Sequence, residues 1–336
     1  MRLNVGLIGL GRLGKVYARD LSSRLANTRL AAVADVDATA AKEVAATFDV
    51  PRSYTDPREM LADRNVDAVV IASPTHTHKD VVIAAAASGK PTFCEKPLAL
   101  ALDDCRTMQD AVEQSGTFFQ MGFMRRFDPG YAAGHKQIAE GRIGRPVVFK
   151  ATSRDPFRPS LEYANPASSG GILVDMGIHD FDLARWFMGE VKTVSAIGGV
   201  LAYPEMATVG DIDNAIATLV FEDGRLGVVD LTRNGFYGYD IITELLGTEG
   251  TIRIGYLRET PVLTMTRNSV THDTVPYFME RFERAYTLQL QNFAENVLHQ
   301  RPAPITIEDG IEALRVALAA TEAYRVGKAV TVKNVQ

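Results

Sequence analysis

The chain has 336 residues, which is too long for one ordinary hydrophobic core and suits two domains. Its 46% hydrophobic and 23% charged residues are typical of a globular protein and exclude a disordered chain. A net charge of −5 with dispersed basic residues argues against a nucleic-acid partner, and no apolar run reaches the roughly eighteen residues that a membrane span needs.

The cysteines and the start of the chain point to a protein of a reducing compartment. Cys94 and Cys105 are the only cysteines, so there is no disulfide framework and no cysteine-based metal site. The apolar segment 3–8 is too short for a signal peptide and is interrupted by a glycine. We therefore expect a buried first strand, a cytoplasmic location and no bound metal.

The first 120 or so residues alternate short β-rich segments with alanine-rich amphipathic segments. The predicted strands are Leu3–Ile8, Leu30–Asp35, Val66–Ala72, Pro91–Glu95 and Thr117–Met121, with helical segments such as Ala38–Phe48 and Val81–Ser88 between them. Several strands are almost entirely apolar, as in sheets that helices cover on both faces. The alternation predicts a doubly wound parallel sheet.

The pattern changes after about Phe123. A helix over Tyr131–Glu140 ends at a glycine-rich turn, and strands then predominate. The predicted strands are Val147–Thr152, Val191–Val200, Ala215–Phe221, Leu226–Thr232, Ile241–Leu246 and Gly250–Ile254. The remaining predicted helices are Met176–Met188, Pro276–His299 and Ile307–Val326.

These elements predict an α/β protein with two domains. Residues 1–123 form a dinucleotide-binding Rossmann domain, and residues 124–336 form an α/β domain for substrate binding and oligomerisation. Several strands of the second domain alternate apolar and polar residues, which suits an open, mostly antiparallel sheet. Because an open sheet face must be covered, we expect a homo-oligomer.

Gly9-Leu10-Gly11-Arg12-Leu13-Gly14 has the G-x-G-x-x-G spacing of a dinucleotide-binding loop. The spacing alone is weak, but here an apolar strand precedes it and a helical segment follows. Gly9 permits the tight turn, Gly11 lets the backbone approach a pyrophosphate, and Gly14 allows close packing of helix on strand. Phosphate oxygens would meet the positive end of the helix.

Asp35 indicates that the dinucleotide is NAD. It ends the second predicted strand, 24 residues beyond Gly11, where an acidic residue receives the adenosine ribose. Its carboxylate would repel the 2′-phosphate of NADP. Arg12 either contacts the cofactor, where it could partly accept a 2′-phosphate, or is a solvated loop residue.

Two further loops follow strands and should reach the ligand-binding edge of the sheet. Ser73-Pro74-Thr75-His76-Thr77-His78 comes after the third long strand. Its two histidines have no carboxylate or cysteine at ligand spacing, so helix capping and cofactor contact are favoured over metal binding. Glu95-Lys96-Pro97 comes after the next strand, where the proline ends the ladder and directs Lys96. In isolation, an ordinary surface lysine is the favoured interpretation of Lys96.

Asp175 and His179 form the second chemical signal. They are four residues apart, so they lie one turn apart on the same face of a helix. Histidine has an ordinary pKa near 6.5, which suits removal of a hydroxyl proton at neutral pH. The carboxylate can orient the imidazole, bind the substrate hydroxyl, or both.

With these motifs together, the chain resembles the family of glucose–fructose oxidoreductases, inositol dehydrogenases and rhizopine-catabolism proteins. The motifs that carry the resemblance occur in the expected order: Gly9–Gly14, Asp35, Ser73–His78, Glu95-Lys96-Pro97 and Asp175-x-x-x-His179. Within that family the chain is most similar to the inositol dehydrogenases. The segments behind this are Gly122–Asp128, Ser153–Pro156, Val174–Arg185 and Tyr237–Asp240.

The resemblance implies an NAD-dependent dehydrogenase that oxidises a CH–OH group of myo- or scyllo-inositol, and a homotetramer. It implies a catalytic trio of Lys96, Asp175 and His179, and a polyol pocket that adds Arg126, Asp155, Tyr237 and Tyr239, while Tyr163 reads better as a packed loop residue. The expected cofactor residues are Gly9, Gly11, Arg12, Leu13, Gly14, Asp35, Val36, Ser73, Pro74, Thr75, His78, Glu95 and Lys96.

Two alternative functions stay open. A member of the same family could act on an aldohexose or a sugar derivative instead of an inositol. Asp155 departs from some relatives that place another polar residue nearby, which leaves the stereochemistry of the substrate open. A dinucleotide-binding sensor without turnover is the alternative from another class. Sensors of this fold tend to lose the lysine or the histidine, and this chain keeps both.

Overall fold

The computed structural model describes residues 2–335, which divide into two compact units. The first unit holds the described residues up to Met124 together with Arg284–Glu312. The second holds Arg125–Glu283 and the described residues from Ala313 onward. The sequence predicts a single boundary between residues 123 and 124. The structure adds a later segment to the first unit, because this segment packs onto the first sheet.

A six-stranded parallel sheet in the order β3-β2-β1-β4-β5-β6 forms the centre of the first unit as described. The strands are β1 (Leu3–Ile8), β2 (Thr28–Ala34), β3 (Ser53–Tyr54), β4 (Ala68–Ile71), β5 (Thr92–Glu95) and β6 (Phe119–Gly122). Every residue of β4, β5 and β6 is buried, as expected for strands that helices cover on both faces. The order confirms the predicted doubly wound sheet.

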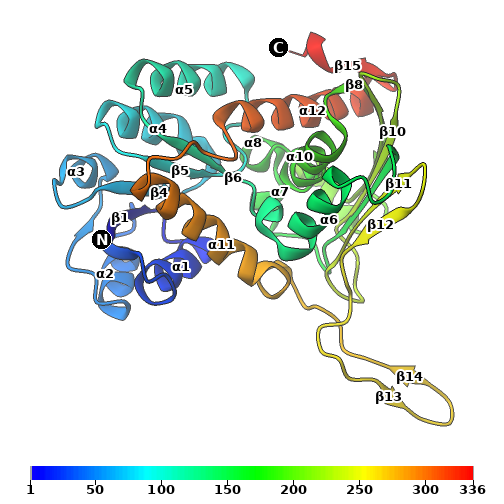
Figure 1. Cartoon of the computed structure of the whole chain (residues 1–336), viewed down its shortest axis with the longest axis horizontal. Coiled ribbons are helices and arrows are strands. Elements are labelled where there is room, and N and C mark those ends of the chain that lie inside the picture. The colour runs from blue at the N-terminus through cyan, green and yellow to red at the C-terminus, as the bar shows by residue number, and fades with distance from the viewer. Residues whose placement is uncertain (1, 336) are drawn as a thin grey trace. The chain divides into compact units, whose positions relative to one another are not determined.

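Helices lie on both faces of this sheet (Figure 1). They are α1 (Arg12–Arg19), η1 (Asp20–Arg24), α2 (Ala38–Thr47), α3 (Pro57–Ala62), η2 (Thr75–Thr77), α4 (His78–Ala87) and α5 (Leu102–Ser115). The later segment adds most of α11 (Phe278–Leu298). Its Phe293 ring lies 5.8 Å from the Phe93 ring of β5, and its Tyr286 ring lies 6.1 Å from the Tyr17 ring of α1. These aromatic contacts join α11 to the first sheet.

The second unit as described contains a seven-stranded sheet in the order β12-β11-β7-β10-β9-β8-β15. Its strands are β7 (Pro146–Arg154), β8 (Val191–Gly199), β9 (Asn214–Phe221), β10 (Leu226–Thr232), β11 (Asp240–Gly247), β12 (Thr251–Ile254) and β15 (Val330–Thr331). Strands β7 and β10 pair in parallel, and the other pairs are antiparallel. The mostly antiparallel prediction is confirmed.

Helices of the second unit gather on one side of this sheet (Figure 1). Figure 1 labels α6 (Pro129–Ala139), α7 (Leu161–Ala164), α8 (Pro166–Ser169), α10 (Gly177–Met188) and α12 (Ile307–Val326), most of which belongs to this unit. The other helical segments are η3 (Met124–Phe127), α9 (Ile172–Asp175), η4 (Pro204–Val209) and η5 (Val332–Asn334). A hairpin of β13 (Thr264–Met265) and β14 (Val270–Thr271) extends away from the sheet.

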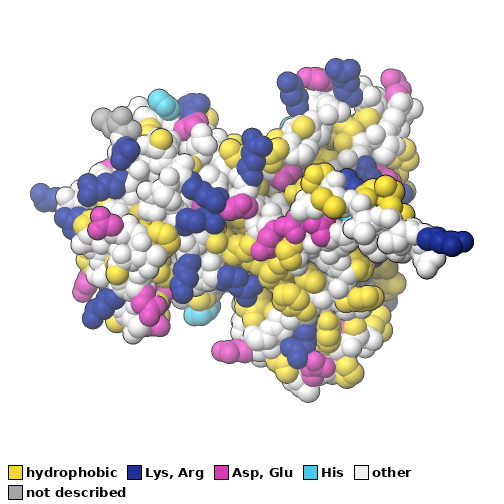
Figure 2. All heavy atoms as spheres, turned by 90° about the horizontal axis from the view of Figure 1, so that it is seen from below, with side chains coloured by type: hydrophobic (Ala, Val, Ile, Leu, Met, Phe, Trp, Pro, Cys, Tyr) yellow, Lys and Arg dark blue, Asp and Glu magenta, His cyan; other side chains and the backbone are white. Residues whose placement is uncertain are grey.

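The other face of the second sheet carries exposed apolar side chains. Ile197 of β8 lies opposite Ile216 of β9, and Val220 of β9 lies opposite Leu226 of β10; all four are exposed. Hydrophobic side chains also gather on the part of the second unit's surface that Figure 2 shows. Exposed apolar side chains on one face of a sheet are a feature of protein–protein interfaces.

Candidate active site

The glycine loop connects β1 to α1, and each of its three glycines has a different environment. Gly9 has a φ of +90°, and a Cβ there would lie 2.4 Å from the backbone nitrogen of Ser73. A Cβ on Gly14 would lie 2.0 Å from the carbonyl oxygen of Gly9. A Cβ on Gly11 would meet no described atom within 4 Å. Gly9 and Gly14 are therefore required by the fold, whereas Gly11 borders open space.

The start of α1 suits a phosphate group. Gly11 is the N-cap residue, and no side chain within residues 2–335 caps this helix start by a hydrogen bond. Backbone N–H groups and the helix dipole at such a terminus favour an anion. The open side of Gly11 gives a pyrophosphate room to approach, so the loop fits a dinucleotide.

Asp35 follows β2 directly and is fixed by the backbone around it. Its Oδ2 accepts a hydrogen bond of 2.7 Å from the Leu10 nitrogen, and its Oδ1 accepts one of 2.9 Å from the Asp37 nitrogen. The carboxylate is thereby held beside the glycine loop, where a ribose hydroxyl could donate to it. Val36, the next residue, is 88% exposed and leaves this edge open to a ligand.

His78 connects two loops of the predicted cofactor site. The ring is 1% exposed, with Nδ1 3.0 Å from the Pro97 carbonyl oxygen and Nε2 2.9 Å from the Ser73 carbonyl oxygen. Burial lowers its pKa. The sequence placed His78 among the cofactor contacts, but its ring nitrogens are directed at the protein backbone. It holds the Ser73 loop, which includes Pro74 and Thr75, next to the Lys96-Pro97 turn.

Glu95 anchors the residue before Lys96. It is 6% exposed, and its Oε1 accepts hydrogen bonds from the hydroxyl of Tyr17 in α1 and from Nε2 of Gln289 in α11, the latter at 3.1 Å. Its Oε2 accepts a bond of 3.1 Å from the backbone nitrogen of Lys96. Burial raises the pKa of Glu95, and the Tyr17 hydrogen bond opposes that shift. Glu95 thus fixes the backbone that carries Lys96.

In the second unit, Asp175 and His179 occupy two consecutive helices. Asp175 is the last residue of α9 and His179 belongs to the first turn of α10. Met176 between the helices keeps right-handed helical torsions, so the predicted one-turn separation is preserved. His179 is 8% exposed. The two side chains form the candidate acid–base pair.

Both oxygens of Asp175 are hydrogen-bonded. Oδ1 accepts a bond of 2.9 Å from the Tyr163 hydroxyl, and Oδ2 accepts one of 3.2 Å from Nη2 of Arg233. The negative charge of Asp175 is the main cause that raises the pKa of Tyr163. The sequence favours a packed loop residue at Tyr163, but in the structure the Tyr163 hydroxyl donates a hydrogen bond to the predicted catalytic carboxylate.

Besides the catalytic trio, four residues are predicted to line the polyol pocket. Three of them, Asp155, Tyr237 and Tyr239, lie at one end of the second sheet. Asp155 follows β7, and its backbone nitrogen donates to the Thr232 oxygen at the end of β10. Tyr239 is buried just before β11, and Asp155 is among the charges that raise its pKa. The Tyr237 hydroxyl donates to Asp240 and accepts from Arg154, the neighbour of Asp155.

Arg126 is held in an ion pair. Its Nε and Nη2 donate to the two oxygens of Asp182 in α10 at 3.0 and 2.6 Å, and its guanidinium lies 5.7 Å from the centroid of the Trp186 ring. This bidentate pair holds the guanidinium against α10. A polyol contact by Arg126 remains a prediction. Its partner, Asp182, is buried in α10.

Sequence patterns did not indicate Arg233 or Asp211 as residues that support Asp175. Arg233, Asp211 and the pair Arg125–Asp180 are all buried. The only local signal for Arg233 and Asp211 is a charged residue beside a strand end. Their partners are distant in the chain, so no spacing rule connects them to Asp175.

Within residues 2–335 no group of three histidine, cysteine or acidic side chains could hold a metal ion. In that same stretch no helix is long and apolar enough to cross a membrane.

Comparison with known proteins gives full-length matches. Two models described as an oxidoreductase family match the chain: the NAD-binding Rossmann fold at residues 3–123 and the C-terminal alpha/beta domain at 135–332. The scyllo-inositol 2-dehydrogenase (NAD(+)) of Bacillus subtilis is 39% identical, over 97% of this chain and 95% of that protein. The myo-inositol 2-dehydrogenase of Thermotoga maritima is 39% identical, over 99% of both.

A solved structure also has a closely similar fold over the full length of the chain. The scyllo-inositol dehydrogenase of Lactobacillus casei, with bound NAD(H) and scyllo-inositol, is similar with a TM-score of 0.95 and 32% identity. The match covers 99% of this chain and 100% of that one.

Proposed function

This chain belongs to the Gfo/Idh/MocA oxidoreductase family and is an NAD-dependent dehydrogenase acting on CH–OH, and we propose that its substrate is myo- or scyllo-inositol. The observation that carries the proposal is the Asp175–His179 pair, with both carboxylate oxygens already hydrogen-bonded. The choice of inositol as the substrate is based on the names of full-length relatives. The product is the keto-inositol.

In the proposed mechanism His179 is the general base. Its imidazole takes the proton of the reacting hydroxyl as the carbon loses hydride. NAD, when bound, would accept that hydride at the nicotinamide C4. Lys96 donates a hydrogen bond to the same substrate oxygen and moderates its changing charge. Asp175 fixes the orientation of substrate and base.

The proposed pocket recognises several hydroxyl groups of the ring at once. Asp155 accepts hydrogen bonds, Arg126 donates them, and the hydroxyls of Tyr237 and Tyr239 do either. A ring with a hydroxyl on every carbon matches such a set. A substrate that lacks one of these hydroxyls would leave a pocket group unpaired, at a cost in transition-state binding.

The test of the substrate is NADH formation with a panel of polyols. We expect absorbance of NADH to rise with myo- or scyllo-inositol, with a kcat/KM at least about tenfold above that for any aldohexose. NMR of the product should show a ketone carbon. A higher kcat/KM for a hexose would assign the enzyme to the sugar-oxidising branch. No NADH with any polyol would favour the non-catalytic sensor.

We also propose that the second unit carries oligomerisation, as a tetramer built on the open sheet face. The supporting observation is the row of exposed apolar side chains on β8, β9 and β10, including Ile197, Ile216 and Leu226. Exposed sheet faces of this kind are normally covered.

Replacing Ile216 with glutamate is expected to lower the molar mass in solution, because a charge would be buried in the interface. Light scattering after gel filtration at micromolar concentration measures this. Val326→Glu provides a matched control, since Val326 is exposed at the end of α12 and not in the sheet. A wild-type monomer, or equal masses for both variants, would contradict the proposed interface.

A further inference from the structure

Arg233 lies behind Asp175 as a fully buried cation. The side chain is 1% exposed and follows β10 directly. Its Nη2 lies 3.2 Å from Asp175 Oδ2 and 3.7 Å from Asp211 Oδ2. One guanidinium nitrogen therefore faces two carboxylates, and one of them belongs to the predicted catalytic residue.

Asp211 connects this cation to the helix that carries Asp175. Its Oδ1 accepts a hydrogen bond of 3.1 Å from the backbone nitrogen of Ile172, the first residue of α9. Asp175 is the last residue of the same helix. Asp211 thus holds one end of α9 while Arg233 holds the other.

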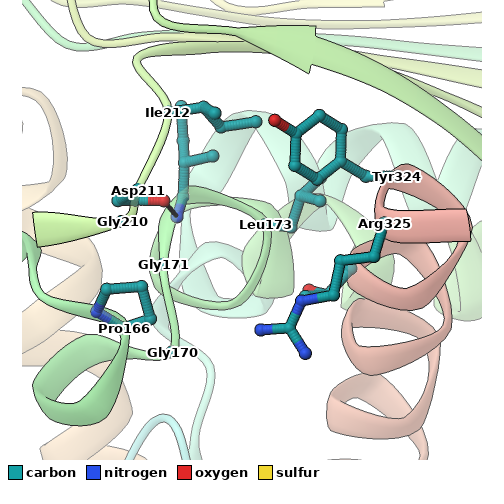
Figure 3. A pocket seen from close by; sticks show the side chains of 11 residues that line it. Pro166, Gly170, Gly171, Leu173, Gly210, Asp211, Ile212, Tyr324 and Arg325 are labelled. Atoms are coloured by element: carbon teal, nitrogen blue, oxygen red, sulfur yellow. Dashed lines mark hydrogen bonds between the residues drawn. The ribbon is translucent and has the colours of Figure 1, made fainter. Parts of the chain in front are cut away.

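The backbone around these residues leaves little freedom. A Cβ on Gly171 would lie 2.8 Å from Asp211 Oδ1, so a glycine there allows the carboxylate to reach the helix start. The backbone nitrogen of Arg233 donates to the Asp213 oxygen at 2.9 Å. Figure 3 shows Asp211 beside Gly170 and Gly171, across a cavity from Tyr324 and Arg325 of α12.

We propose that Arg233 is a positioning residue for the dehydrogenase: held by Asp211, it keeps Asp175 ionised and in one orientation toward the substrate. The inference rests on the proposed function, because it assigns a task to the residue behind Asp175. Arg233 itself touches the carboxylate and not the reacting atoms in this assignment.

Among the groups around Asp175, Arg233 is expected to have the largest effect on the ionisation of its carboxyl. Tyr163 from α7 donates a neutral hydrogen bond, and His179 from α10 is the proposed base. Asp211 is a second negative charge, and burial raises its pKa. Of these groups, Arg233 is the permanent cation. An opposite charge at this range lowers a carboxyl pKa by about one to three pH units, so its removal should raise the pKa of Asp175.

The first experiment compares Arg233→Met with Arg233→Lys. We expect Arg233→Met to lower kcat for inositol oxidation at least about tenfold, with a smaller change in KM, because a loosely held carboxylate positions the transition state poorly. The acidic limb of the kcat/KM profile, which the proposed base His179 governs, should also move up by about one pH unit or more, because the lost cation no longer disfavours protonation of the Asp175–His179 pair. Arg233→Lys, which keeps the charge without the planar fork, should restore part of both effects.

Arg185→Met is the matched control, since it removes a mostly buried guanidinium from an ion pair with Glu190 at the far end of α10. It should leave the pH midpoint unchanged. A folded Arg233→Met enzyme with the wild-type kcat and midpoint would overturn the proposal. An equal shift in Arg185→Met would reduce Arg233 to a general structural role and overturn it as well.

Two further measurements test the inference, and the second of them does not depend on turnover. Asp211→Asn removes the second negative charge at constant volume, so the acidic midpoint should move down, opposite to Arg233→Met.

Carbon-13 NMR of labelled aspartate carboxyls, with Asp175→Asn for assignment, follows the Asp175 titration directly. We expect its midpoint to rise by about one pH unit in Arg233→Met; an unchanged midpoint refutes the charge effect. If the midpoint rises but no polyol is oxidised, the proposed function fails and the electrostatic link remains.

Discussion

His179→Ala is expected to lower kcat by about 10²–10⁴-fold, which is the usual contribution of a general base. Alanine cannot accept the hydroxyl proton, so water must take it. NAD binding should be retained, because the glycine loop and Asp35 belong to the first unit and His179 to the second. Steady-state kinetics with the accepted inositol, and a fluorescence titration with NAD, measure the two effects.

A matched control for this substitution is His135→Ala. His135 is also in the second unit, where its ring stacks on Trp186 with centroids 4.0 Å apart. Its loss removes an aromatic contact without touching the candidate acid–base pair. We expect kcat within a few-fold of wild type. Near-normal turnover by His179→Ala would remove His179 from the role of base.

Alanine substitutions at Gly14 and Gly11 are expected to have opposite consequences. At Gly14 the new methyl group would lie 2.0 Å from a backbone oxygen, so α1 or the loop must move. Overpacking of this kind costs about 1–3 kcal/mol and often more where backbone atoms clash. At Gly11 no described atom lies within 4 Å, so the folded chain accepts the methyl group. That group would occupy the approach of the pyrophosphate.

Thermal unfolding and NAD titration separate the two cases. Gly14→Ala should lower Tm by several degrees or prevent folding. Gly11→Ala should keep the wild-type Tm while the Kd for NAD rises at least about tenfold, or about 1.4 kcal/mol. An unchanged Tm for Gly14→Ala would contradict the close packing. An unchanged Kd for Gly11→Ala would mean that the cofactor does not pass over this glycine.

Much of the fold could be predicted from the sequence because its signals are local. Continuous apolar segments gave β1 with its observed bounds, and the alternation in 226–232 gave β10. The helical periodicity of 307–326 gave α12. Elements with weaker patterns were not predicted, including the two-residue strands β13 and β14, in which every residue is exposed.

The candidate site was predictable in its principal residues but not in their supports. Asp175 and His179 follow from a spacing of four within one segment. Glu95 was expected to contact the cofactor, yet its carboxylate is bonded inside the first unit to residues from α1 and α11. The hydrogen bond between Gln289 and Tyr17 joins residues 272 positions apart. Side-chain pairing over such distances depends on the packed structure, and a single sequence carries no spacing signal for it.

The discontinuous make-up of the first unit also affects how the protein is synthesised. Residues 284–312 leave the ribosome only after residues 125–283 have been made. At about 5–20 residues per second this delay is roughly 8–30 s. During that time Phe93 and Tyr17 lack the cover that Phe293 and Tyr286 later provide. The newly made nucleotide-binding half must therefore keep an apolar face out of contact with other chains until translation nears its end.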